Sequence, residues 1–135
     1  MMDDAAAITH LAELRKLYAV LMEQGYESII FHGLDWSSYY AAGYFQSLKP
    51  VLGDSFILCV VKDRESITDE GVPVSAFDHI ESLEDEDMYF DQTEFYRYLL
   101  ERSGLLALLY PKENPASEEL EIVAKTTGCK VMTIP

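Results

Sequence analysis

The sequence predicts a single α/β domain, built as a three-layer α/β/α sandwich around a mostly parallel sheet of four to five strands. Short apolar runs rich in β-formers alternate along the chain with amphipathic segments of helical spacing. The run Ser55–Val61 shows no polar alternation, which is typical of parallel strands buried on both faces. The chain has 135 residues, 49% of them hydrophobic, which suits one domain with one core.

The first expected element is a long helix near the amino terminus. Asp3 or Asp4 stands where an N-cap belongs, and Gly25 stands where a C′ glycine ends a helix. Its predicted buried face is the set of apolar residues that recur at helical spacing, namely Ile8, Leu11, Leu14, Tyr18 and Leu21.

A strand, a second helix and another strand are expected next. The apolar run Ser28–His32 predicts the first strand. Asp35 is the expected N-cap of a helix over Trp36–Leu48, and Pro50 stands just beyond its expected end, because proline does not continue a helix. The run Ser55–Val61 predicts the second, interior strand.

The middle of the chain is polar and then strongly acidic. Residues 63–71 predict a loop. Residues 72–77 predict an edge strand, because Pro73 cannot donate to a central ladder. Residues 78–91 form the most acidic stretch of the chain and predict a solvated segment.

The last third predicts two further helices, each followed by a strand. Residues 91–102 predict a helix whose start has capping-box character, and Leu105–Tyr110 predicts a strand after it. Ser117 is expected to cap a helix that Gly128 closes, and Lys130–Ile134 predicts the final strand.

The charge of the chain limits its partners. Twenty-four acids against ten bases give a formal charge of −14 at pH 7. Such a field repels nucleic-acid backbones and anionic membranes, and it attracts basic surfaces and speeds their encounter. We therefore expect no direct nucleic-acid or membrane binding, and a basic protein as partner.

The location predicted from the sequence is the cytoplasm. The start, Met1–Ala7, lacks the basic and apolar regions of a signal peptide, and the longest apolar run, residues 105–110, is far too short to span a bilayer. Cys59 and Cys129 form no Cys-x-x-Cys pair, which fits a reducing compartment and argues against a zinc knuckle.

Polar residues follow the expected strands at their carboxyl ends, where open parallel sheets bind ligands. If these strands are neighbours, the residues could converge on one crevice, although polar residues also follow strands simply because loops are solvated. The candidates are His32 and Asp35 for catalysis, His32 as acid or base, and Lys62, Arg64, Lys112 and Asn114 for an anionic ligand.

Common enzyme signatures are missing. The chain has no Gly-x-Gly-x-x-Gly fingerprint, no Walker-type phosphate loop and no Gly-x-Ser-x-Gly elbow. No histidine pair has metal-site spacing, and the acids lack the pattern of a calcium loop. No cofactor and no metal are expected.

The acidic stretch is the candidate surface for a basic partner. Charges would steer the partner and neighbouring aromatic rings would anchor it, although a solvated loop would look the same in the sequence. The residues concerned are Glu84, Asp85, Glu86, Asp87, Met88 and Tyr89.

The helix Trp36–Leu48 carries aromatic residues around more than one face, so some rings must be exposed or covered by another subunit. This pattern predicts a homodimer through that helix.

Two functions from different classes stay open at this stage. The first is an acidic interaction module, such as an inhibitor, an immunity-type protein or an adaptor. The alternative is a small enzyme or ligand-binding domain that takes an anionic small molecule at the strand carboxyl ends.

Overall fold

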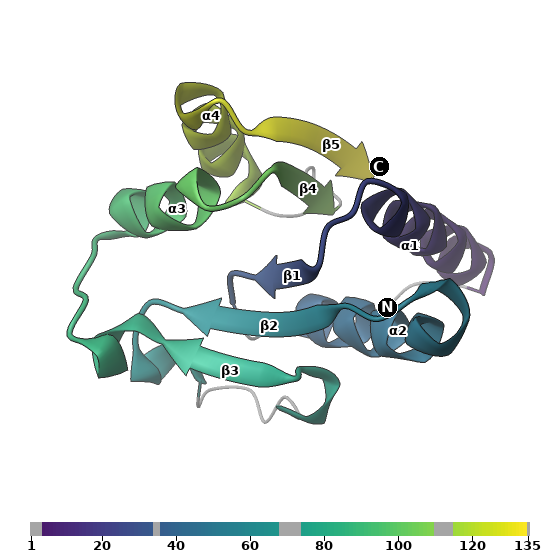
Figure 1. Ribbon diagram of the computed structural model, residues 1–135. Coiled ribbons are helices and arrows are strands. Elements are labelled where there is room, and N and C mark those ends of the chain that lie inside the picture. Colours follow the sequence, from purple (N-terminus) through teal and green to yellow (C-terminus); the bar gives the residue numbers. More distant parts are fainter. Residues whose placement is uncertain (1–3, 34–35, 68–73, 110–114, 135) are drawn as a thin grey trace. The chain divides into compact units, whose positions relative to one another are not determined.

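A computed structural model of the chain describes residues 4–33, 36–67, 74–109 and 115–134 (Figure 1). It mixes α-helices with parallel strands, which confirms the predicted α/β class. The residues group into two compact units, Met1–Asp87 and Met88–Pro135, and each is described by itself. The described strands form one sheet of three and one of two. A single domain with one sheet of four to five strands in three layers stays a prediction.

The first unit contains a three-stranded parallel sheet and two helices. The sheet order is β1-β2-β3, with Ile29 opposite Ile57 and Cys59 opposite Ile80. The longest of its strands, β2, therefore lies in the centre and hydrogen-bonds on both edges. The elements are α1 (Asp4–Glu23), β1 (Ser28–Phe31), α2 (Trp36–Leu52), β2 (Phe56–Val61) and β3 (His79–Ser82).

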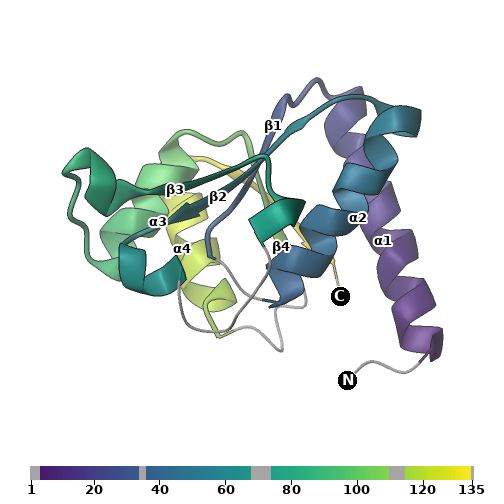
Figure 2. The same cartoon turned by 90° about the horizontal axis from the view of Figure 1, so that it is seen from below.

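Helices α1 and α2 lie side by side (Figure 2) and share a buried core with the sheet. The ring of Tyr18 on α1 lies 5.3 Å from that of Phe45 on α2, and Phe45 lies 6.3 Å from Phe31 on β1. The residues that α1 and α2 bury are Leu14, Leu17, Tyr18, Leu21, Ala41, Ala42, Phe45 and Leu48.

The first helix largely follows its sequence pattern. Gly25 has φ +80°, and Tyr26 donates its N–H to the Leu21 carbonyl at 3.0 Å, so the predicted C′ glycine ends α1. Leu11, predicted to face inward, is exposed, and Leu17 is buried in its place. Among the α1 side chains whose burial is described, the buried face is therefore Leu14, Leu17, Tyr18 and Leu21, and Leu11 departs from the predicted face.

The predicted end of α2 is wrong. Pro50 lies inside the helix, which continues to Leu52. Proline has no N–H for the Gln46 carbonyl, but the N–H of Gly53 still bonds to the Lys49 carbonyl at 3.1 Å. The helix ends only where Gly53 adopts φ +122°.

The predicted edge strand over residues 72–77 is also wrong. Residues 74–76 form a turn of 3₁₀ helix, residues 72 and 73 lie outside the described residues, and the third strand is His79–Ser82. Asp78 explains the shift, because its N–H bonds to the Ile57 carbonyl at 2.7 Å and its carboxylate accepts from the Ile57 N–H. These two bonds align the following residues with β2.

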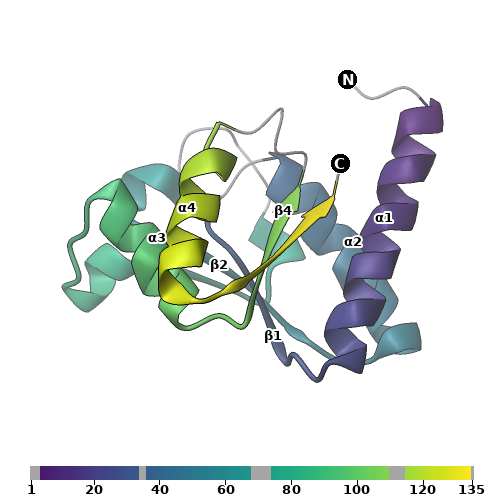
Figure 3. The same ribbon diagram turned by 90° about the horizontal axis from the view of Figure 1, so that it is seen from above.

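The second unit pairs two helices with a two-stranded parallel sheet (Figure 3). Asp91 caps α3 in the predicted capping box, since its side chain accepts from the Glu94 N–H at 2.8 Å. Ser117 does not cap α4, because the helix begins one residue earlier in the chain, at an Ala116 N-cap. The elements are α3 (Gln92–Glu101), β4 (Leu105–Leu109), α4 (Ser117–Thr127) and β5 (Lys130–Ile134).

Replacing Tyr18 by Phe should destabilise the protein by about 1–2 kcal/mol, because the Gly53 carbonyl and the Ser55 hydroxyl lose the Tyr18 hydroxyl as their hydrogen-bond partner. The hydroxyl donates to the Gly53 carbonyl at 2.8 Å and lies 2.9 Å from the Ser55 Oγ. Urea unfolding measures the change, with the exposed Tyr40→Phe as control. Equal stability of the two variants would show that the hydroxyl does not tie α1 to the start of β2.

Candidate functional site

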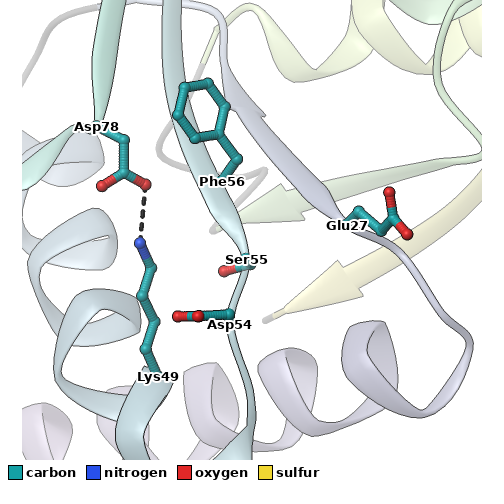
Figure 4. A pocket seen from close by; sticks show the side chains of 6 residues that line it. All are labelled: Glu27, Lys49, Asp54, Ser55, Phe56 and Asp78. Atoms are coloured by element: carbon teal, nitrogen blue, oxygen red, sulfur yellow. Dashed lines mark hydrogen bonds and ion pairs between the residues drawn. The ribbon is translucent and has the colours of Figure 1, made fainter.

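A shallow surface depression of about 530 Å³ lies at the amino ends of the strands of the first unit (Figure 4). Glu27 stands before β1, Asp54 before β2 and Asp78 before β3, and Lys49 reaches in from α2. Sequence reasoning selected the opposite, carboxyl edge of the sheet, so it missed these residues. Nothing in their spacing signals that they meet.

Asp78 is the centre of a hydrogen-bond network in this depression. Its carboxylate accepts from the Lys49 Nζ at 2.8 Å, the Ile57 N–H at 2.7 Å and the Gln46 Nε2 at 3.1 Å. Gln46 also donates to the Ala76 carbonyl at 3.1 Å. The ammonium of Lys49 is thus held by the protein's own carboxylate, and the network fixes the entry of β3 against α2 and β2.

The pKa of Asp78 lies below its ordinary value of 3.8. Partial burial acts to raise it, but the hydrogen bonds from Lys49, Ile57 and Gln46 and the charge of Lys49 outweigh that effect. The carboxylate therefore stabilises the fold above its ordinary pKa.

The carboxyl edge of the same sheet holds the described members of the predicted crevice. His32 follows β1 and Lys62 follows β2, and both side chains are half-buried. Arg64 begins a short 3₁₀ helix after β2 and is exposed. Asp35, Lys112 and Asn114 lie outside the described residues, so a shared crevice stays a prediction.

Arg64 is bound by two residues of the predicted acidic surface. Its backbone N–H donates to the Glu84 carboxylate at 3.0 Å, and its guanidinium bonds to the Asp85 carboxylate through both Nε and a terminal nitrogen. An anionic ligand would have to displace Asp85 from this side chain. Arg64 and the acids, assigned by sequence to two different sites, thus belong to one cluster.

Four consecutive acids, Glu84–Asp87, form what we call the acidic segment. It follows β3 as a 3₁₀ turn over Leu83–Glu86, which is anchored by the buried Leu83. Asp87 closes the turn in the left-handed region, with φ 59° and its N–H bonded to the Glu84 carbonyl at 3.1 Å. The last three acids are exposed, while Glu84 is half-buried.

The remaining predicted partner-binding residues begin the second unit. Tyr89 is 72% exposed and Met88 is half-buried. The next residue, Phe90, stacks against Tyr98 of α3 with ring centroids 5.3 Å apart. Of the two neighbouring rings, Tyr89 faces solvent and Phe90 packs against α3.

Glu81 on β3 forms a hydrogen bond with Glu86 of the acidic segment. A hydrogen bond with the Glu86 carboxyl raises the pKa of Glu81 above its ordinary value of 4.5, and burial and the charge of Glu86 act in the same direction. His79 partly opposes the shift. Two like charges resist joint ionisation, so this pair lowers stability once both carboxyls are ionised.

The described part of the chain contains neither a candidate metal site nor a membrane-spanning helix. Within it, no three His, Cys, Asp or Glu side chains gather in a way that could hold a metal ion. None of the helices found there is long and apolar enough to cross a membrane.

Comparisons with protein-family models, with curated proteins and with solved structures find no match to this chain. The assignment of a function therefore rests on the residues and geometry given above.

Asp78→Asn should destabilise the protein by about 1 kcal/mol at pH 7, because the charge-assisted bonds are weakened. The folded pKa of Asp78 is depressed, so its contribution is present above pH 3.8 and disappears as the pH falls through the folded value. Urea unfolding from pH 7 to pH 3 measures the difference, with Asp54→Asn in the same depression as control. If the native protein and Asp78→Asn differed in unfolding free energy by the same amount at pH 7 and at pH 3, the Asp78 carboxylate would not stabilise the fold in this way.

Glu86→Gln should stabilise the protein by about 0.5 kcal/mol at pH 7, because it removes a carboxylate that repels Glu81. The gain should shrink as the pH falls through the raised pKa of Glu81, where the native pair already shares a proton. NMR titration of Glu81 should show its pKa moving toward 4.5 in the variant. Glu101→Gln, with the same charge change on α3, should leave that titration unchanged.

Proposed function

We propose that this chain is an acidic protein-interaction module, an inhibitor, immunity-type protein or adaptor, that binds a basic surface of another protein. The acidic segment Glu84–Asp87 provides the charge, and Met88 and Tyr89 provide the apolar anchor. The observation that carries the proposal is the exposure of three consecutive carboxylates on a turn with a defined backbone.

The backbone of this turn supports a preorganised surface. Leu83 is buried, and the Asp87 N–H bonds back to the carbonyls of Glu84 and Leu83. A fixed turn loses little conformational freedom when a partner docks on it, so more of the interaction energy remains for binding.

The contact with Arg64 supports a basic partner. Oδ1 of Asp85 already accepts a hydrogen bond from Nε of this guanidinium and forms an ion pair with a terminal nitrogen of it, so the turn accommodates an arginine side chain. The total charge of −14 adds a long-range attraction that speeds encounter with a basic surface. The same charge opposes direct binding of nucleic acid.

The proposal includes a cytoplasmic setting. Cys59 and Cys129 are both free thiols, as is usual in a reducing compartment. The alternative, an enzyme or ligand-binding domain at the carboxyl edge, gains no comparable support from His32 or Lys62 within the described ranges.

An arginine-rich peptide is the probe for this surface, and calorimetry at two salt concentrations is the measurement. One variant neutralises the whole acidic segment and changes the net charge from −14 to −10. Its substitutions are Glu84→Gln, Asp85→Asn, Glu86→Gln and Asp87→Asn. It should weaken binding about tenfold or more, and the loss should shrink at high salt, where charges are screened. Asparagine at position 87 tolerates the left-handed backbone.

The matched control neutralises four exposed acids elsewhere, Glu23, Glu27, Glu101 and Glu118, and reaches the same charge of −10. It should lose much less affinity than the first variant. Equal losses in both would mean that total charge attracts the peptide, and the acidic segment would then not be the binding surface.

A further inference from the structure

Helix α2 differs from the rest of this acidic chain in its charge. Its sequence, Trp36–Leu52, contains no Asp or Glu, whereas α1, α3 and α4 each carry at least two acids. Its one charged side chain, Lys49, is paired with Asp78 at 2.8 Å. With the Lys49 charge compensated, α2 presents a neutral surface on a molecule of charge −14.

This neutral helix also exposes apolar side chains along one side. Tyr40, Tyr44 and Val51, with the polar Ser47 between the last two, recur at intervals of four, three and four residues, which places them in one stripe along the helix. Tyr40 is 62% exposed and Val51 is 72% exposed, while Tyr44 is half-buried. The stripe is separate from the face that α2 buries against α1 and the sheet.

The surface of the stripe is uneven, with a protruding ring next to open space, and another helix could pack against it. Apart from its own helix backbone and chain neighbours, no atom lies within 4 Å of the position that a Cβ on Gly43 would occupy, so there is open space at Gly43. The Tyr40 ring contacts that of Tyr39, with centroids 5.5 Å apart, which restricts its orientation. The Tyr40 ring of one copy could therefore pack into the open space at Gly43 of a second copy.

We propose that a second copy of this chain packs on the Tyr40–Val51 stripe, so that α2 pairs with α2 in a two-fold symmetric dimer. Two copies of a −14 chain repel one another over most of their surfaces, and the neutral stripe is where they approach at least cost. A basic partner would gain no charge attraction there. In a symmetric dimer the same patch serves both subunits, so an uncharged patch meets no like charge on its partner.

The expected strength and salt dependence follow from this arrangement. The stripe spans twelve residues, about 17 Å of helix from Tyr40 to Val51, so it buries less than a standard interface and should give a weak dimer. Added salt screens the repulsion between subunits and should strengthen the dimer. Binding of a basic partner through the acidic segment should instead weaken with salt, so the two proposals fail or succeed separately.

Sedimentation velocity of the full chain tests the proposal, at protein concentrations from about 10 µM to about 1 mM and in about 0.05 M and 0.5 M NaCl. Tyr40→Glu and Val51→Glu each place a charge on the stripe. Ile122→Glu, an exposed apolar position on α4, makes the same charge change elsewhere. Circular dichroism and thermal unfolding establish that each variant folds.

The expected result is a dimer that tightens with salt, weakens about tenfold or more with either stripe variant, and is unaffected by Ile122→Glu. A monomer at every concentration and salt would overturn the proposal. So would a dimer that dissociates on adding salt, or one that Ile122→Glu weakens as much as Val51→Glu does.

Discussion

The hydrogen bonding of β2 on both of its edges is the constraint on which the first unit depends. A strand buried between two parallel neighbours must satisfy every N–H and C=O through them. Ile57, Cys59, Val60 and Val61 are all buried, so no water can replace a missing neighbour. Parallel pairing then demands a crossover between β1 and β2, and α2 supplies it. The third strand completes the ladder, because Asp78 bonds to both backbone groups of Ile57.

The two ends of this sheet carry different parts of the chemistry. At the amino ends, Asp78, Lys49 and Gln46 form a hydrogen-bond network in which the charges of Lys49 and Asp78 compensate each other. At the carboxyl ends, the chain leaves β3 directly into the acidic segment, and only Arg64 supplies an ion pair to it among the described residues. Where the strands enter, Lys49 compensates the charge of Asp78 while Glu27 and Asp54 stay exposed, and where β3 ends, three consecutive acids are exposed.

The distribution of charge gives the molecule two kinds of surface. The acidic segment places Glu86 beside Glu81 of β3, and these two carboxyls resist joint ionisation. Helix α2 has no acid and exposes Tyr40 and Val51. Long-range attraction belongs to the first surface and short-range apolar contact to the second, so they suit partners of different chemistry.

The sequence by itself determined the elements whose signals are local. Periodicity located the helices, Gly25 and the Asp91 capping box marked helix ends, and the continuous apolar run located β2. It placed the third strand wrongly, because His79–Ser82 has little apolar pattern and becomes a strand only through Asp78 and Ile57, which lie 21 residues apart. The candidate residues were recognised as types, but the pairing of Arg64 with Asp85 and of Lys49 with Asp78 joins positions 21 and 29 apart. Tertiary structure alone decides such pairs, because strand order and register determine which distant side chains meet.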